Sequence, residues 1–316
     1  MNKILSTGLV TALLCMSGSV WAGEKIDQVV NTTNDGRVSI DVMNGKVKIR
    51  TWDKNEVRVA GELDDAAEGY RFESTESGRV LFKVEMPKRR WGSWKDDGSN
   101  LEFWIPINNE LRYEGVNADV DVDGVMGGSR VNTVNGGIDA NGLNGRIELE
   151  TVNGKIKSKA LSGKIKLDTV NGAIKDEDSD GEVQIETVNG DIRTTSKAQR
   201  VEISNVNGDM DLSLSKVKEL EISTVNGDID MQVELMKDSR FFVSTVGGDA
   251  DIKFIGDVSA EFNIEAHSGG DIRNKLTKDK VKRDKYGPGE SLKFQTGGGS
   301  AEVEIDTVGG DITIEK

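Results

Sequence analysis

A four-residue motif returns at a fixed spacing through the middle of this chain of 316 residues. Thr-Val-Asn-Gly occupies 133–136, 151–154, 169–172 and 187–190, so each copy starts 18 residues after the one before. A weaker repeat of nine residues lies within it, because glycines stand nine apart from Gly127 to Gly190, and from Gly136 an apolar residue follows each of them two positions later. A fixed short period of this kind is typical of a solenoid.

Each nine-residue unit has room for one strand and one turn. Asn-Gly, Ser-Gly or Asp-Gly marks the turn, where a left-handed backbone is accepted most cheaply. In the segment 163–168, Ile165 and Leu167 alternate with charged residues, which is the pattern of a strand with one buried face. Two units make one coil of about 18 residues, and a coil must stack on its neighbours to bury its apolar row. The sequence therefore predicts an all-β fold, a parallel β-solenoid (β-helix) with two short strands per coil.

Stacking places identical residues above one another in columns. The valines of the motif are expected to form one column and the asparagines another beside it, where a buried or half-buried amide can bond to the next amide along the axis. The asparagines concerned are Asn135, Asn153, Asn171, Asn189, Asn207 and Asn226.

The chain divides into three parts by its pattern. Residues 1–22 have one positive charge, a short apolar core and a small residue at the end, which indicates a secretory signal peptide cleaved near Ala22. Residues 23–115 are irregular strands that are expected to cap one end of the stack. Residues 116–316 form the regular solenoid, with a basic loop at 273–290 expected to protrude or to form a short helix.

Composition narrows the compartment and the partners. A formal net charge of −14 argues against nucleic acid or an anionic membrane as a partner. No segment after residue 22 approaches the ~20 apolar residues of a transmembrane span. The sequence thus predicts an exported protein, either periplasmic or extracellular at the cell surface.

Two groups of residues are candidates for binding. Trp91 and Trp94 follow Arg89 and Arg90 in a loop that could stack on a sugar or meet a lipid interface, or else fold over the cap with solvated cations. The second group is a predicted aspartate column that could hold calcium, or whose repulsion a cation such as Arg193 could relieve. The column consists of Asp191, Asp209, Asp228 and Asp249.

Other cofactors and catalytic residues are not expected. His267 is the only histidine, so the sequence predicts neither a histidine-based zinc or copper site nor a triad. Carboxylates are abundant, but residues 133–211 contain no aromatic residue to line a sugar groove.

Several of these segments resemble one bacterial family. The opening 45–53, the Ile105-Pro106 pair, the serial Thr-Val-Asn-Gly-Asp-Ile units and Gly287-Pro288-Gly289 are similar to the putative-adhesin family of unknown function, which is related to the head domains of auto-transporter adhesins. The resemblance covers nearly the whole chain after residue 22. It implies a right-handed β-helical solenoid in an envelope or extracellular protein, and it supplies no catalytic residues.

The favoured function is therefore a non-enzymatic adhesin or structural interaction module of the cell envelope, with a surface protein or a glycan as partner. The alternatives are a polysaccharide-active β-helix lyase or hydrolase and a calcium-dependent binding module. An enzyme requires a groove with convergent carboxylates and aromatics, whereas a scaffold requires only repeating columns.

Overall fold

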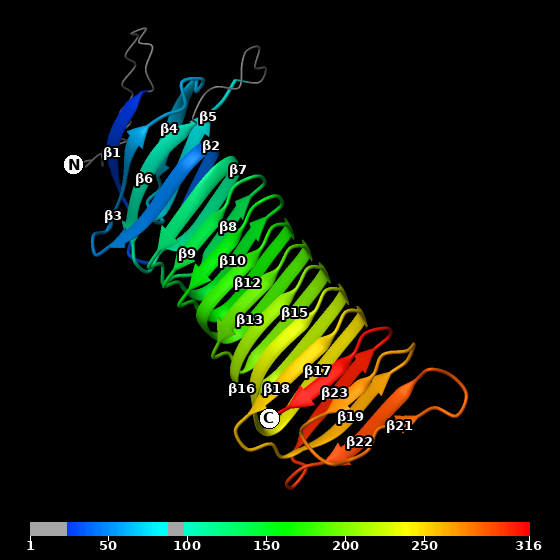
Figure 1. The fold of residues 1–316 in the computed structure, drawn as a ribbon. Helices are drawn as coiled ribbons and strands as arrows, with labels where there is room; N and C mark the ends of the chain where they lie inside the picture. The colour runs from blue at the N-terminus through cyan, green and yellow to red at the C-terminus, as the bar shows by residue number, and fades with distance from the viewer. Residues whose placement is uncertain (1–23, 88–97) are drawn as a thin grey trace, which may run out of the picture.

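The structure is a computed structural model that describes residues 24–87 and 98–316. The described residues contain no helix; they form 24 strands joined in one hydrogen-bonded sheet. Consequently no described helix is available that could cross a membrane. Figure 1 shows an elongated stack of strands with irregular structure at both ends.

The middle of the molecule follows the predicted repeat. Ile147 pairs with Ile165, and Ile165 pairs with Val183, all in parallel strands offset by 18 residues. These strands are β8 (Ser129–Thr133), β9 (Ile138–Asn141), β10 (Asn144–Thr151), β11 (Ile156–Lys159), β12 (Ser162–Asn171), β13 (Ile174–Asn189), β14 (Ile192–Ser196), β15 (Arg200–Asn207), β16 (Met210–Asn226), β17 (Ile229–Gly247) and β18 (Ala250–Ile255). The all-β class and the parallel stacking are thus confirmed.

Long strands connect the two faces of the stack. β13 pairs with β12 through its second half and with β11 through its first half. β7 (Glu110–Asp123) likewise pairs with both β8 and β9. Because β8 pairs with β10, β10 with β12, and β9 with β11, hydrogen bonding passes through a closed ring of seven parallel strands. At some corners the strand therefore continues through the turn as one long strand. The sequence pattern predicts two separate short strands there instead.

The interior is a narrow file of aliphatic side chains. Ile165 is 1% exposed and Leu167 is fully buried, as the alternation predicts. The motif threonines also point inward, and the hydroxyls of Thr133, Thr151, Thr169 and Thr187 each donate to a carbonyl oxygen of the preceding coil. Thr151 Oγ1 lies 3.0 Å from the Gly136 oxygen and Thr169 Oγ1 lies 3.1 Å from the Gly154 oxygen. A buried polar group with a partner costs little, so threonine is tolerated at these four corners.

The corner glycines serve two different needs. Gly163 has φ +113°, in the region that favours glycine. Gly172, in the Asn-Gly corner, lies outside that region; a Cβ there would meet the Gly154 carbonyl oxygen at 1.8 Å. At the motif glycines Gly136, Gly154, Gly172 and Gly190 a left-handed backbone is therefore the wrong explanation, and the close approach of successive coils is the right one.

The N-terminal end places its coils out of chain order. β2 (Arg37–Trp52) lies between β5 and β6 on its outer side and β7 on its inner side. β1, β3 and β4 add antiparallel pairings outside the repeat. The strands of this end are β1 (Lys25–Asn31), β3 (Glu56–Glu62), β4 (Gly69–Ser74), β5 (Arg79–Glu85) and β6 (Ser99–Pro106).

The C-terminal end uses the same device. β23 (Ala301–Thr307) pairs in parallel with both β17 and β19 (Ala260–Ala266), and in Figure 1 the red β23 lies between them. β24 (Ile312–Glu315) lies likewise between β18 and β20 (Ile272–Asn274). The segment next to 246–249 along the stack is therefore 308–311, although 268–271 is the next similar segment in the sequence. Thr307 continues the threonine column above Thr245, whereas β19 offers Ala266 there, so 301–312 matches the repeat better.

β22 (Glu290–Gln295) and β21 (Lys282–Arg283) close this end by antiparallel pairing with β19 and with each other. The rings of Phe262 and Phe294 stack with centroids 4.4 Å apart across β19 and β22. The segment 273–290 protrudes in Figure 1, and it carries the short strand β21 and no helix.

Candidate functional site

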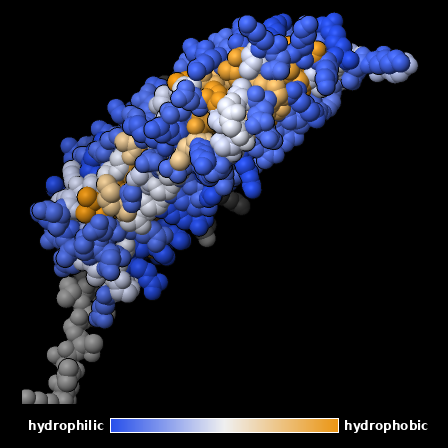
Figure 2. Space-filling model, turned by 90° about the horizontal axis from the view of Figure 1, so that it is seen from below, coloured by the Kyte–Doolittle hydropathy of each residue, from blue (hydrophilic) through white to orange (hydrophobic). Residues whose placement is uncertain are grey.

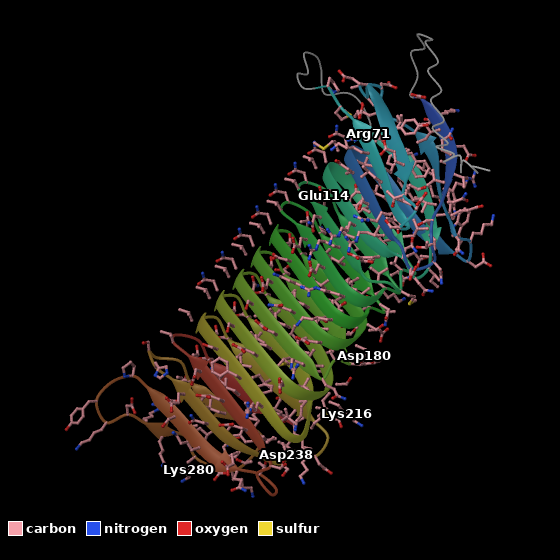
Figure 3. The ribbon with its side chains drawn as sticks, turned by 180° about the vertical axis from the view of Figure 1, so that it is seen from behind. Arg71, Glu114, Asp180, Lys216, Asp238 and Lys280 are labelled. Carbon is pink, nitrogen blue, oxygen red and sulfur yellow. The ribbon has the colours of Figure 1, made fainter. Side chains whose placement is uncertain are left out.

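The outer surface of the stack carries rows of identical side chains. The motif valines are all partly exposed, at 38–46% of their surface, from Val134 through Val246 and on to Val308. Figure 2 shows hydrophobic patches within a mostly hydrophilic face, and Figure 3 shows a regular row of side chains along the edge opposite Asp180, Lys216 and Asp238. We call the eight valines the valine row: Val134, Val152, Val170, Val188, Val206, Val225, Val246 and Val308.

The predicted asparagine ladder runs beside the valine row. Each Nδ2 donates to the Oδ1 of the preceding coil, at 2.8 Å from Asn153 to Asn135 and 2.9 Å from Asn171 to Asn153. The ladder starts at Asn44 and continues to Asn226. Amide-to-amide bonding is confirmed, although the amides are exposed where burial or half-burial was expected.

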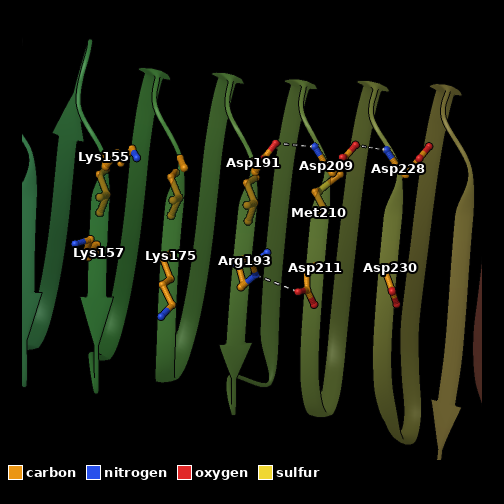
Figure 4. A pocket seen from close by; sticks show the side chains of 14 residues that line it. Lys155, Lys157, Lys175, Asp191, Arg193, Asp209, Met210, Asp211, Asp228 and Asp230 are labelled. Atoms are coloured by element: carbon orange, nitrogen blue, oxygen red, sulfur yellow. Dashed lines mark hydrogen bonds and ion pairs between the residues drawn. The ribbon is translucent and has the colours of Figure 1, made fainter.

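A charged groove of about 510 Å³ lies on the other face of the stack. Strands β11, β13, β14, β16 and β17 present its side chains in rungs, with lysines at one end and aspartates at the other (Figure 4). The charged lining residues are Lys155, Lys157, Lys175, Asp191, Arg193, Asp209, Asp211, Asp228 and Asp230. The lining contains no aromatic side chain, so the groove lacks the sugar platform expected of the polysaccharide-active alternative.

The two ends of the groove differ in how their charges are compensated. Arg193 Nε lies 3.1 Å from Asp211, and Lys175 pairs with Glu177. Among the residues that the structure describes, Lys155 and Lys157 form no ion pair. Lysines without an ion pair, in a chain of net charge −14, leave this end of the groove able to attract an anionic group.

The predicted aspartate column borders the groove, and the structure brings its four members together. Oδ1 of Asp191 accepts the backbone N–H of Asp209 at 3.2 Å, and Asp209 in turn accepts that of Asp228 at 3.0 Å (Figure 4). The same bond joins Asp228 to Asp249 at 2.9 Å. The carboxylates of Asp191, Asp209 and Asp228 thus each accept a hydrogen bond from a backbone N–H of the next coil. The spacing of the aspartates in the sequence does not reveal these bonds.

The column also extends beyond its predicted end, through Asp311 and Asp271. The N–H of Asp271 bonds to the Asp311 carboxylate and, with Arg273, holds the pKa of Asp311 below its usual value. Calcium binding by Asp191, Asp209, Asp228 and Asp249 stays a prediction. A fall of several degrees in the melting temperature on adding EDTA would support it, and an unchanged melting temperature would remove it.

The predicted aromatic site lies outside the described residues, since Arg89, Arg90, Trp91 and Trp94 fall within 88–97. The signal peptide 1–22 and its cleavage near Ala22 do so as well. These assignments stay predictions. The test of the aromatic site is to replace Trp91 and Trp94 by alanine, and the expected result is a loss of glycan binding.

Some of the basic side chains of the loop at 273–290 form ion pairs with carboxylates of the fold. Lys275 pairs with Glu315, and Arg283 Nε lies 2.6 Å from the buried Glu290. In the described part of the chain Lys278, Lys280, Lys282 and Lys285 have no ion-pair partner. At its tip Tyr286 is 86% exposed, with Lys285 Nζ 5.3 Å from the ring centroid.

His267 has acidic neighbours that the sequence reasoning missed. Glu265 on β19 faces Asp306 on β23 in register, and His267 follows on the same face. Ligand atoms of the three side chains lie within 4.8 Å of one another. Burial, and then the charge of Glu265, raises the pKa of Asp306. Only the non-sequential position of β23 creates this cluster, so no spacing along the chain signals it.

Taken together, the geometry is that of a non-globular all-β stack that displays repeated rows and a charged groove. The match of residues 28–315 to a family model shows that the chain belongs to the Toastrack DUF4097 family. No curated protein matches the sequence.

Among solved structures, the chain is similar to a putative cell adhesion protein from Clostridium sporogenes, with 9% identity over 92% of this chain and 99% of that one and a TM-score of 0.23. It is also similar to a putative adhesin from Bacteroides fragilis, with 11% identity over 92% and 97% and a TM-score of 0.35.

Proposed function

We propose that this chain is an exported, non-enzymatic interaction module of the bacterial cell envelope, of the adhesin type. It would bind a surface protein or an envelope glycan through the charged groove, from a stack of right-handed winding in the periplasm or at the cell surface. The family resemblance of its motifs supports this class of function.

One observation carries the proposal: the charged groove has a basic end at Lys155 and Lys157, which form no ion pair with a described residue, and an acidic end at Asp209, Asp211, Asp228 and Asp230. Successive rungs stand roughly 4.8 Å apart, so charges recur at a fixed spacing along the axis. A partner with an anionic segment opposite the lysines and a cationic segment opposite the aspartates would fit. Complementarity of this kind sets specificity and association rate more than affinity.

The test is capture of partners from envelope extracts with the tagged chain and with a double variant, Lys155→Glu with Lys157→Glu. The variant reverses the basic end of the groove without touching the buried face, so it should fold and lose the partner. A matched control, Lys216→Glu with Lys237→Glu, makes the same charge change at exposed lysines outside the groove lining.

The expected result is capture by the unaltered chain and the control, and at least a severalfold loss in the groove variant. Because the contact is electrostatic, 0.5 M salt should also release the partner. Equal capture by all three proteins would exclude the groove. Localisation of the tagged protein in the cytoplasm would exclude the envelope assignment.

A further inference from the structure

His267 interrupts the valine row at its C-terminal end. Its backbone N–H donates to the Thr307 oxygen at 3.0 Å, and the next N–H, that of Ser268, donates to the Val308 oxygen at 2.7 Å. His267 therefore stands beside Val308, in the position that valine holds in eight other coils. A departure from a repeat that is otherwise kept is a reason to examine what surrounds it.

The residues two positions earlier also place two carboxylates face to face. This position carries Glu150, Asp168 and Glu186 in the middle coils, then Ser204, Ser223 and Ser244, and finally Asp306 on β23 and Glu265 on β19. In the middle coils Lys166 forms ion pairs with both Asp168 and Glu186. Among the described residues no cation is shared in this way by Glu265 and Asp306, and Glu265 lies two residues before the imidazole that replaces valine.

The pair of carboxylates is incompletely compensated. Lys293, on β22, places Nζ 3.5 Å from Glu265, but its side chain is 65% exposed. Asp306 forms no ion pair with any residue that the structure describes. Like charges directly opposite each other on paired strands are destabilising. A cation between the two strands would remove that repulsion.

We propose that Glu265, His267 and Asp306 form a binding site for one divalent transition-metal ion, with Zn²⁺ as the preferred probe. One imidazole nitrogen and two carboxylate oxygens are ligands that Zn²⁺ accepts, with water completing the shell. Bonds of about 2.0–2.2 Å put tetrahedral ligands about 3.4 Å apart. Donor atoms already within 4.8 Å need only side-chain rotation to reach that spacing.

The site lies where the ion would act as a clamp. Glu265 and His267 belong to the C-terminal closing strands, whereas Asp306 belongs to the coil inserted between β17 and β19. A bound ion therefore joins the closing strands to the stack. This role is independent of the charged groove on the other face, so either proposal can fail without the other.

The test is calorimetric titration of ZnCl₂ into the chain without residues 1–22 and without a histidine tag. We expect one equivalent to bind. His267→Val restores the valine of the repeat, so it should fold normally and weaken binding on the order of 10–100-fold or more. Asp306→Asn should weaken it similarly. Asp238→Asn removes the same charge from an exposed position outside both the groove and the aspartate column, and it should leave zinc binding unchanged.

A second readout separates the site from adventitious zinc on an acidic surface. Co²⁺ bound to the unaltered chain should show visible ligand-field bands, and zinc should raise its melting temperature; His267→Val should abolish both effects. Absence of zinc binding by the unaltered chain would overturn the proposal. So would equal affinity in His267→Val, since binding would then belong to carboxylates elsewhere.

Discussion

The regular middle of the molecule and its two ends are built by different means. In the middle, each coil follows its neighbour in chain order, and the threonine and asparagine columns link successive coils through identical bonds. At the ends, β2 and β23 are each inserted between two other coils, and antiparallel strands cover the outside. A terminal coil with neighbours on both sides cannot peel off by fraying alone. The repeat supplies length, and departure from the repeat closes the stack.

The side chains differ in the same way. Aliphatic residues fill the middle, while aromatic rings gather at the ends, with Phe82 and Phe103 5.0 Å apart at one and Phe254 and Phe262 5.4 Å apart at the other. A coil that lies between two similar coils needs only a narrow row of aliphatic side chains to fill its interior. A closing layer must fill wider and less regular space, for which large rings are suited.

The largest expected effect is in the middle, from Ile165→Asp. Ile165 is 1% exposed and lies between Ile147 and Val183, so the new carboxylate has no polar partner. Burial of an unpaired charge should cost several kcal/mol and unfold the central coils. Circular dichroism and urea denaturation measure this. Lys164→Asp, on the exposed side of the same strand, is the control and should remain folded.

A neighbouring pair of glycines gives a sharper test of coil contact. A Cβ on Gly136 would lie 1.9 Å from the Ala118 carbonyl oxygen, whereas one on Gly137 would meet nothing nearer than 3.6 Å. Gly136→Ala should therefore cost about 2–4 kcal/mol through forced separation of coils. Gly137→Ala should be neutral or stabilising by up to about 1 kcal/mol, because it restricts the unfolded chain. Equal unfolding free energies for the two variants would contradict the close approach.

An effect confined to one end is expected from Phe294→Ala. Phe294 stacks on Phe262 and holds β22 against β19, so truncation should cost about 2–3 kcal/mol in that closing layer. Hydrogen exchange should speed up in 260–295 and stay unchanged in 129–207. Faster exchange throughout the molecule would mean that the ends and the middle unfold as one unit.

The sequence predicted the middle well and the ends poorly, for a physical reason. Register in a repeat is fixed locally, because a one-residue slip would move Ile165 and Leu167 from the buried face of the strand to the exposed face. Chain order at the ends depends on which distant segment fits a given rung. Thr307 and Val308 repeat the residues of the Thr245-Val246 coil, so they fit next to it better than Ala266 and His267 do. No periodicity in the sequence predicts that the chain returns to this position after forming β19. The cluster around His267 follows from that jump and was missed with it.

The smallest effect is expected at a buried carboxylate within the regular middle. Asp176 is 1% exposed, and its oxygens accept hydroxyls from Ser158 at 2.6 Å, from Thr194 at 3.0 Å and from Ser179. Ser158 and Thr194 belong to the coils on either side, so the column supports a polar group that one coil could not. Burial nevertheless raises the pKa of Asp176, against the lowering effect of these hydroxyls.

The sign of the pH dependence follows from that direction. The folded chain holds the Asp176 proton more tightly than the unfolded chain, so this stabilisation is complete below the unfolded pKa of about 3.9 and is lost as pH rises through the folded pKa. Asp176→Asn should flatten the decline in unfolding free energy between pH 4 and pH 7, by about 1.4 kcal/mol for each unit by which the pKa is raised.

Asp178 is the matched control, because it lies two residues away with the opposite shift. Its bond to Lys197 lowers the pKa of Asp178, so its contribution is present above the unfolded pKa and is lost as pH falls. Asp178→Asn should therefore leave the decline between pH 4 and pH 7 intact, and its φ of +58° suits asparagine. Urea denaturation at several pH values distinguishes the two variants. An Asp176→Asn profile parallel to that of the unaltered chain would mean that the hydroxyls outweigh burial and keep this carboxylate charged inside the stack.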